Sequence, residues 1–454
     1  FLDYTTLAQR KQLCEEELRL DSRFAKDLYV GVVPITMDDQ RICVDGEGEP
    51  VEYAVKMRRF PDDALLSGQL TANRVQKEHV LQLAAAIADF HQRAAIVEPT
   101  AYSLEGVLRD AVDNLCELQP VVADEEHILR NLQTWTRDTF EEHRHVFEGR
   151  VENGFIRECH GDLHLGNIVY WGERFIPFDG IEFNESFRWI DVLSDVAFLA
   201  MDFAAHQRDT LGHTFLNAYL EHTDDRHALA LLRWYEVYRA LVRAKVASLR
   251  AQQLAAAGED ATTTIADRQQ HIDLAHRLSH VPTPCLFITH GVSGSGKTTV
   301  SDAIVERLGA IRLRSDIERK RLYGATTSEP LSAQAQDELY SPAASEATYA
   351  KLRTDAQEIL QAGYSVVLDA TFLQHSQRQA ALELARRLGV DFSILDCEAD
   401  ESTLRQRVKE RLAQGQDASD ADVQVLESQL ATRQPLSEDE RQLVVDLPSP
   451  LPRS

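Results

Sequence analysis

A glycine-rich segment, GVSGSGKT at 291–298, has the spacing G-x-x-x-x-G-K-[ST] between an apolar run and a helical pattern. Such a loop surrounds a β-phosphate with backbone N–H groups, while its lysine bridges the β- and γ-phosphates and its hydroxyl holds Mg²⁺. The sequence therefore predicts a site for ATP and Mg²⁺, with Lys297 catalytic and Thr298 a metal ligand. The residues expected to hold the nucleotide are Gly291, Ser293, Gly294, Ser295, Gly296, Lys297, Thr298 and Thr299.

Two carboxylates further along the chain follow strand-like runs. Asp369 ends a buried apolar run, which is the usual position of a carboxylate that helps to bind Mg²⁺. Asp316 follows another such run, and ligands of open parallel sheets bind at the carboxyl ends of the strands. Asp316 is therefore a candidate general base for an attacking hydroxyl, and Arg319 or Lys320 a candidate partner for an anionic group on the acceptor. An ordinary helix cap at Asp316 and an ordinary strand end at Asp369 are the alternatives.

Three arginines, Arg405, Arg407 and Arg411, lie in one helical pattern. Arg407 and Arg411 are four residues apart and so share a helix face. We expect this pair to close over the transferring phosphoryl group as a lid. Ordinary solvated helix charges are the alternative.

A second motif, HGDLHLGN at 160–167, fits H-G-D-x-x-x-x-N. Phosphoryl transfer from ATP needs an acid beside the acceptor hydroxyl and oxygen ligands for Mg²⁺. Asp162 is placed for the first task and Asn167 for the second. The segment Ile168–Phe178 predicts a β-hairpin that returns Asp179 to Asn167 as a second metal ligand. His164, in the same motif, is expected to pack or to brace the loop.

The elements that position these motifs divide the chain into two parts. Amphipathic helical patterns dominate the first part, whereas strands and helices alternate in the second, which predicts a parallel sheet with crossover helices. Two prolines in HVPTP at 280–284 mark the expected boundary between domains 1–280 and 281–454, and AAAGEDATTT at 255–264 is a joint within helical sequence. The predicted strands are Leu28–Val33, Glu52–Met57, Pro284–Thr289, Ile311–Arg314, Ser365–Leu368 and Phe392–Leu395.

The second part resembles the small P-loop kinases related to polynucleotide kinase and zeta toxin, over about residues 284–447. The resemblance rests on GVSGSGKTT at 291–299, SDIERK at 315–320, DATF at 369–372 and the R-x-x-x-R pattern at 407–411. It implies a hydroxyl acceptor, with Asp316 in the general-base position and Arg407 and Arg411 in the lid.

The first part resembles the aminoglycoside phosphotransferase family, a branch of the protein-kinase-like fold. Asp162, Asn167 and Asp179 match its motif residues, and Asp191 and Asp195 in WIDVLSDVAF match its downstream acidic segment. Over nearly the whole chain, the fused pair resembles bifunctional bacterial proteins that join such a phosphotransferase to an ATP-binding kinase. The expected fold is α/β: a protein-kinase-like domain with a mostly helical C-lobe, followed by a P-loop NTPase domain with a parallel sheet.

The first part departs from the full kinase-like pattern at its start. That pattern needs glycine-containing strands and a strand lysine, followed by a helix glutamate that pairs with the lysine. A helical pattern, LAQRKQLCEEELRL, follows Thr5 or Thr6 as its cap and offers Glu15, Glu16 and Glu17 as candidates for the helix glutamate. Lys56 comes after this helix and therefore cannot be the preceding strand lysine. The chain begins with Phe1 and its first Met is Met37. We therefore expect the first strands to lie upstream and the first domain to be truncated.

Composition narrows the class of protein. The 454 residues carry 48 Lys and Arg against 73 Asp and Glu, a formal net charge of −25, and 44% are hydrophobic. Neutralising phosphates needs clustered Lys and Arg, so general nucleic-acid binding is disfavoured, with RLRSDIERKR at 312–321 as a local exception. Six scattered cysteines and short apolar runs predict a cytoplasmic protein with reduced thiols and no membrane partner.

The leading interpretation is an ATP-dependent bacterial kinase that phosphorylates a hydroxyl of a small molecule. A nucleic-acid 5′-hydroxyl kinase is the first alternative, suggested by the resemblance of the second part. A nucleotide-dependent regulator with a degenerate kinase module is the second, although the intact Asp162, Asn167 and Asp179 argue against degeneracy. The identity of the acceptor and the oligomeric state do not follow from the sequence.

Overall fold

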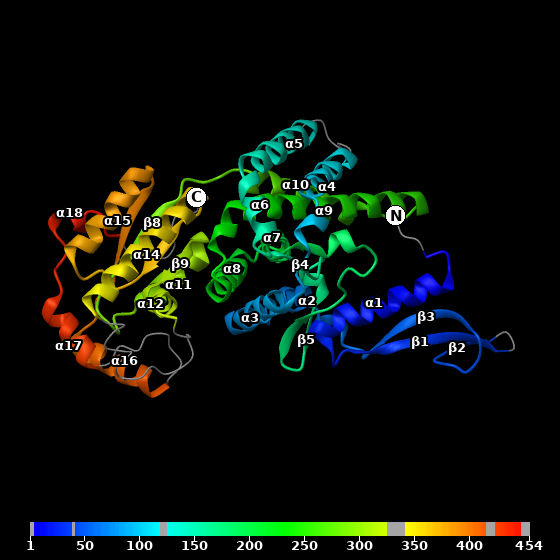
Figure 1. Cartoon of the computed structure of the whole chain (residues 1–454), viewed down its shortest axis with the longest axis horizontal. Coiled ribbons are helices and arrows are strands. Elements are labelled where there is room, and N and C mark those ends of the chain that lie inside the picture. Colours follow the sequence, from blue (N-terminus) through cyan, green and yellow to red (C-terminus); the bar gives the residue numbers. More distant parts are fainter. Residues whose placement is uncertain (1–3, 39–40, 119–124, 325–340, 415–422, 446–454) are drawn as a thin grey trace. The chain divides into compact units, whose positions relative to one another are not determined.

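The computed structural model describes residues 4–38, 41–118, 125–324, 341–414 and 423–445 (Figure 1). The chain forms two compact units. The first contains residues 1–224 and 231–280, and the second contains residues 225–230 and 281–454. Among the described residues, no helix combines the length and the apolar character that a membrane crossing requires.

The first unit begins with a helix against a small sheet (Figure 1). Helix α1 (Leu7–Ala25) starts at Thr6, whose hydroxyl accepts the N–H of Gln9 while the Gln9 side chain accepts the N–H of Thr6. This reciprocal capping satisfies two N–H groups that a helix start leaves unpaired. Strands pair antiparallel in the order β2-β1-β3. The predicted strands at 28–33 and 52–57 are confirmed as β1 and β3, but the short, fully exposed β2 was not predicted.

A helical body completes the first unit, and its central helix is α7 (Val192–Ala205), in which 13 residues are buried. Phe198 and Met201 of α7 pack with Val237 and Leu241 in one core cluster. The hairpin predicted at 168–178 is confirmed as β5 and β6. The remaining elements of this unit are β1 (Tyr29–Asp38), β2 (Arg41–Val44), β3 (Pro50–Met57), α2 (Leu66–Thr71), α3 (Lys77–Arg93), α4 (Leu104–Glu117), α5 (Glu125–Glu142), α6 (Arg144–Glu152), β4 (Ile156–Glu158), β5 (Ile168–Trp171), β6 (Arg174–Pro177), β7 (Trp189–Asp191), α8 (Asp209–Thr223), α9 (Leu229–Ala257) and α10 (Thr262–Leu278).

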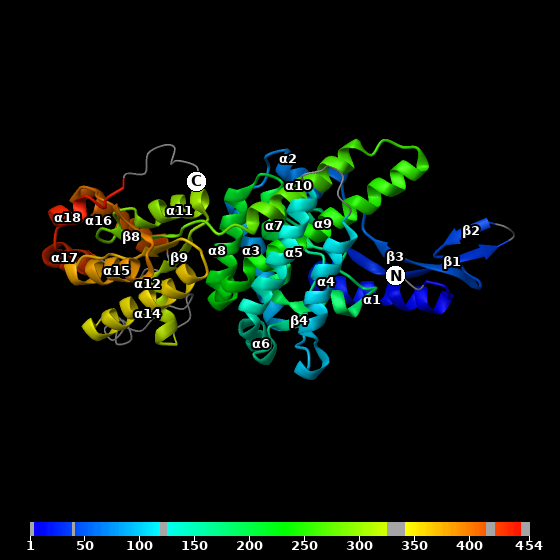
Figure 2. The same ribbon diagram turned by 90° about the horizontal axis from the view of Figure 1, so that it is seen from above.

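The second unit is built on a parallel four-stranded sheet in the order β11-β8-β10-β9. Figure 2 shows α11 on one side of this sheet and α14 and α15 on the other. Apolar residues of the strands and of α11, among them Phe287, Ile304, Val367 and Leu395, form a core cluster. The predicted parallel sheet with crossover helices is therefore confirmed.

The four predicted strands of this sheet are confirmed to within one or two residues at each end. The buried Arg378 also donates to both carboxylate oxygens of Glu440 at 2.9 Å and so ties α18 to α15. The elements of the second unit are η5 (Arg226–Ala228), β8 (Cys285–His290), α11 (Lys297–Leu308), β9 (Ile311–Arg314), α12 (Ser315–Leu322), α14 (Pro342–Gln361), β10 (Val366–Asp369), α15 (His375–Leu388), β11 (Asp391–Asp396), α16 (Glu401–Gln414), α17 (Val423–Thr432) and α18 (Glu438–Arg441).

Candidate active sites

The phosphate-binding loop of the second unit connects β8 to α11. Gly296, the N-cap residue of α11, has φ 95°, and Gly291 has φ 147°. A Cβ atom on Gly291 would lie 2.5 Å from the Cys397 carbonyl oxygen and 2.5 Å from Ser295 Oγ, so only glycine fits there. Lys297 Nζ donates to the Val292 carbonyl oxygen at 2.9 Å, and its side chain therefore folds back over the loop.

A cavity of about 330 Å³ opens beside this loop, and five of the residues predicted from the sequence line it: Ser293, Lys297, Thr298, Asp316 and Asp369. Lys297, Thr298 and Asp369 line it together with Asp316 and Arg319. The other lining residues are mainly polar: Ser293, Arg314, Ser315, Ser345, Tyr349, Thr371, Leu373, Gln374, Gln377, Val425, Ser428, Gln429 and Thr432. Phosphate-binding groups, carboxylates and cations thus share one polar cavity.

The two carboxylates of this cavity differ in their surroundings. Asp369 is buried, and its Oδ2 accepts a hydrogen bond from Ser301 Oγ at 2.9 Å. Asp316 is partly exposed and lies 3.6 Å from Nη1 of Arg319. The N-cap residue of α12 is Arg314, and Asp316 lies within the first turn, so Asp316 does not act as the helix cap. Arg319 and Lys320 were both considered as the cation that pairs with an anionic group on the acceptor. Arg319 lines the cavity, whereas Lys320 is absent from the described lining.

The three arginines of α16 have different environments. Arg407 Nη1 donates to the Gly294 carbonyl oxygen of the phosphate-binding loop at 3.2 Å. Arg405 forms exposed ion pairs with Glu401 and Glu427, which matches the alternative of solvated helix charges. Arg411 belongs to the same helix, but its side chain lies outside the described residues.

The residues of the cavity fit Mg²⁺ and a nucleotide by their chemistry. Thr298 and Asp369 offer a hydroxyl and a carboxylate oxygen, the ligand type that Mg²⁺ prefers. In the adjoining phosphate-binding loop, the backbone of Gly291 packs against the Cys397 carbonyl oxygen and Ser295 Oγ, and α11, which begins at Lys297, presents the backbone N–H groups of a helix start that suit an anion. Ser295 Oγ is buried without a hydrogen-bond partner in the described part of the chain. An ATP phosphate and its metal therefore match the donors present.

Several lining residues were missed by the sequence prediction. Gln429 of α17 accepts the N–H of Ser293 through its Oε1 at 2.7 Å, which closes α17 over the loop. Tyr349 of α14 shares a hydrogen bond with Thr371 and accepts the N–H of Phe372, and so supports the segment after β10. Both residues lie in ordinary amphipathic helical patterns, which carry no signal for such a role.

In the first unit, the predicted catalytic loop brings Asp162 and Asn167 together. Asn167 Nδ2 donates to Asp162 Oδ2 at 2.9 Å. His164 Nδ1 accepts the N–H of Gly166, so the imidazole proton is on Nε2, which faces Asp162 Oδ2 at 3.4 Å. Burial would raise the pKa of Asp162, but the hydrogen bond from His164 and the electrostatic effects of His164, His160 and Arg239 together outweigh it and lower this pKa to about 2. Asp162 is therefore ionised at neutral pH, and His164 braces it.

The backbone at Asp179 is strained, and residues near the start of the first unit hold it by hydrogen bonds. Asp179 has φ 62°, a conformation that non-glycine residues rarely adopt. The hydroxyl oxygen of Tyr29 accepts the N–H of Asp179 at 3.1 Å, and Asp21 Oδ1 accepts the N–H of Gly180 at 2.8 Å. Asn167 Nδ2 also lies 3.4 Å from the Asp179 carbonyl oxygen. The hairpin thus returns Asp179 to Asn167.

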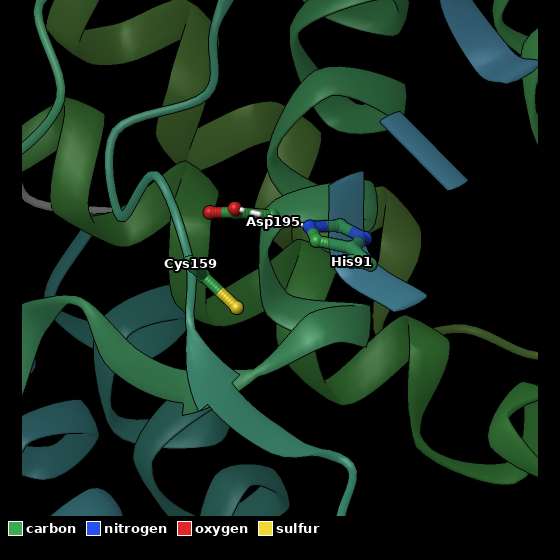
Figure 3. A group of neighbouring side chains, drawn as sticks. All are labelled: His91, Cys159 and Asp195. Carbon is green, nitrogen blue, oxygen red and sulfur yellow. Dashed lines mark hydrogen bonds and ion pairs between the residues drawn. The ribbon is translucent and has the colours of Figure 1, made fainter. Parts of the chain in front are cut away.

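A buried group of His91, Cys159 and Asp195 supports the same loop (Figure 3). Their nearest ligand-type atoms lie within 4.8 Å of one another. Asp195, however, accepts the N–H groups of His160 at 2.8 Å and Gly161 at 3.0 Å. Burial raises the pKa of the Cys159 thiol well above its usual range, which disfavours the thiolate that a metal would need. We interpret the group as a brace that holds the catalytic loop.

Glu17 is the glutamate of α1 with an unusual environment. Glu15 pairs with Lys11 and Glu16 with Arg19 and Arg188, whereas burial and the carboxylates of Glu182, Asp21 and Asp179 raise the pKa of Glu17 to about 7. Lys56, the lysine that follows α1 in the chain, forms an ion pair with Asp45.

The raised pKa of Glu17 predicts a loss of stability with rising pH. Between about pH 4.5 and pH 7 the folded state binds more protons at Glu17 than the unfolded state, so its free energy of unfolding falls as the pH rises. The shift corresponds to about 3 kcal/mol, which exposure of this half-buried group reduces to about 1–2 kcal/mol. Glu17→Gln should therefore raise the melting temperature at pH 8 but not at pH 4.5. Glu15→Gln is the exposed control, and an equal effect at both pH values would contradict the prediction.

Comparison with known proteins places these two sites in known families. Residues 6–232 match the sequence model of the phosphotransferase enzyme family, and residues 286–436 match that of an AAA domain. The chain is a two-part phosphotransferase: it belongs to the phosphotransferase enzyme family and carries a P-loop kinase domain in its second part. Both resemblances stated from the sequence are confirmed.

Relatives extend over most of the chain. An uncharacterized protein of Mycobacterium bovis and one of Mycobacterium tuberculosis are each 30% identical over 427 residues, which cover 92% of this chain and 82% of theirs. A gluconokinase from Sinorhizobium meliloti is 25% identical over 37% of this chain and 85% of its own, with a TM-score of 0.25. A choline/ethanolamine kinase family protein from Mesorhizobium loti is 12% identical over 61% of this chain and 84% of its own, with a TM-score of 0.34. Because both TM-scores are below 0.5, neither likeness defines a substrate.

Proposed function

We propose that this protein is a bacterial, cytoplasmic kinase that transfers the γ-phosphoryl group of ATP to a hydroxyl of a small molecule, with Mg²⁺ as cofactor. The observation that carries the proposal is the cavity of about 330 Å³ in the second unit. It combines the phosphate-binding Lys297, the oxygen ligands Thr298 and Asp369, and a carboxylate, Asp316, for the acceptor proton. Its limited volume and polar lining suit a small, polar acceptor.

In the proposed phosphoryl transfer, each of the groups at this cavity has a distinct role. The acceptor oxygen forms a bond to the γ-phosphorus while the bond from that phosphorus to the departing ADP breaks, and Asp316 takes the acceptor proton. Lys297 stabilises the charge on the β- and γ-phosphates, and Arg407 approaches from α16. Mg²⁺ held by Thr298 and Asp369 would supply further neutralisation of phosphate charge.

The first unit offers a second set of groups for the same chemistry. We propose Asp162 as its proton acceptor and Asn167 and Asp179 as its metal ligands. The ionised state of Asp162 and its 2.9 Å contact with Asn167 support this assignment. The amide donates to Asp162 through Nδ2, so Asn167 Oδ1 is the atom suited to a metal.

A screen with γ-labelled ATP tests the proposed function. Sugars, aminoglycosides, nucleosides and 5′-hydroxyl oligonucleotides serve as acceptors, and we expect transfer to a small polar molecule. Transfer to oligonucleotides alone, with steeply salt-dependent binding, would establish the nucleic-acid kinase instead, against the net charge of −25. ATP binding without transfer to any acceptor would favour the regulatory alternative.

A further inference from the structure

A buried network of charges joins the two helices that form one wall of the cavity. Glu318 of α12 is fully buried, and its Oε1 accepts Arg226 Nη2 at 2.5 Å while its Oε2 accepts Arg226 Nη1 at 3.2 Å. Arg226 Nη1 also donates to Asp355 Oδ2 of α14 at 3.1 Å. One guanidinium group therefore bridges a carboxylate of α12 and a carboxylate of α14.

Two more cations complete this network. Arg321 Nη1 donates to Glu318 Oε1 at 2.6 Å, and Lys351 Nζ lies 3.0 Å from Asp355 and 3.8 Å from Glu318. Arg321 and Lys351 belong to α12 and α14 themselves, whereas Arg226 comes from η5, 92 residues before Glu318 and 129 before Asp355. A buried charged network is costly to form unless its geometry is precise, and replacing it by apolar residues is often neutral for stability. Its presence here calls for a role besides stability.

The same two helices carry groups of the cavity. Asp316 and Arg319 lie on α12 within three residues of Glu318, and Ser345 and Tyr349 lie on α14. The groups proposed to bind phosphate, in contrast, come from the loop after β8 and from α11. We propose that Arg226 is a positioning residue that fixes α12 against α14 and so holds Asp316 and Arg319 at the reacting end of the cavity. This inference rests on the proposed function of the cavity.

The test compares Arg226→Ala, Arg226→Lys and the neighbouring His227→Ala in the full chain. His227 forms an exposed ion pair with Glu358 and is the matched control. ATP hydrolysis, in which water replaces the acceptor, gives kcat and KM, and a fluorescent ATP analogue gives the dissociation constant. For Arg226→Ala we expect a kcat about 10-fold lower, with the KM for ATP and the dissociation constant within twofold of the wild type. Arg226→Lys should restore part of kcat, and His227→Ala should change neither constant.

Two results would overturn the positioning role. One is an unchanged kcat in an Arg226→Ala variant that melts well above the assay temperature. The other is a loss of ATP binding in parallel with kcat, which indicates general destabilisation. If Arg226→Ala does not fold, Asp355→Asn, which keeps the Arg226–Glu318 pair, should lower kcat severalfold at unchanged nucleotide affinity, and an unchanged kcat rejects the proposal.

Two further measurements separate this inference from the proposed function. If Lys297→Ala leaves ATP hydrolysis intact, the function proposed for the cavity is contradicted. If hydrolysis depends on Lys297 but not on Arg226, the positioning role alone is contradicted. Hydrogen–deuterium exchange needs no activity. In Arg226→Ala, amides of α12 should exchange faster than in the wild type while those of α11 do not change, and unchanged protection of α12 overturns the inference.

Discussion

Lys297→Ala, measured in the full chain with Asp162→Asn present to disable the first unit, should lower ATP turnover about 10²–10³-fold, because it removes a cation aimed at charge that develops on the phosphates. Thr298 and Asp369, the proposed metal ligands, line the same cavity and remain present in this variant. Steady-state release of phosphate from ATP measures the effect, and circular dichroism confirms that the variant is folded. Lys409→Ala, which removes an exposed lysine of α16 in the same unit, is the control for the change of charge. Unchanged turnover would refute the assignment of the working site to the second unit.

Asp316→Asn is expected to slow phosphoryl transfer about 10²–10⁴-fold, the range that a positioned general base supplies. The amide keeps the shape of the side chain but does not take up the acceptor proton. The affinity for a fluorescent ATP analogue should stay within twofold of the wild type, because Asp316 belongs to α12, whereas the proposed nucleotide-binding groups belong to the loop after β8 and to α11. Asp316→Glu should recover part of the rate.

The comparison of Asp316→Asn with Asp302→Asn gives the matched control. Asp302 belongs to α11 and pairs with Arg312, and it is absent from the described lining of the cavity. A transfer rate that falls equally in both variants would indicate destabilisation of the unit. A rate unchanged in Asp316→Asn would leave Asp316 as an ordinary residue of a helix first turn and remove it from the proposed mechanism.

The features predicted from the sequence are those encoded over a few neighbouring residues. The loop at 291–298, the hairpin that returns Asp179, and the strands of the parallel sheet follow from local spacing and apolar runs. Thr6 was one of two candidate caps, and the reciprocal contact with Gln9 selects it. Local patterns were thus sufficient to predict the fold class and a part of the cavity lining: Ser293, Lys297, Thr298, Asp316 and Asp369.

The features that sequence reasoning missed depend on residues far apart in the chain. Gln429 reaches Ser293 across 136 residues, and Arg226 reaches Asp355 across 129. The exposed strand β2 has four residues and no buried face, so no alternation of polar and apolar residues marks it. His91 of α3 and Asp195 of α7, 104 residues apart, meet beside α8, which packs against both helices, and helix packing leaves no local signal. Such contacts follow from the tertiary structure.

The assignment of residues 225–230 to the second unit has a practical consequence for dissecting this enzyme. The chain passes between the two units at three places, after Asp224, after Ala230 and after His280. A recombinant fragment that starts at residue 281 would lack the Arg226 guanidinium, which bridges Glu318 and Asp355. Domain deletion is therefore a poor way to divide activities between the halves, and point substitutions in the intact polypeptide are the suitable genetic tool.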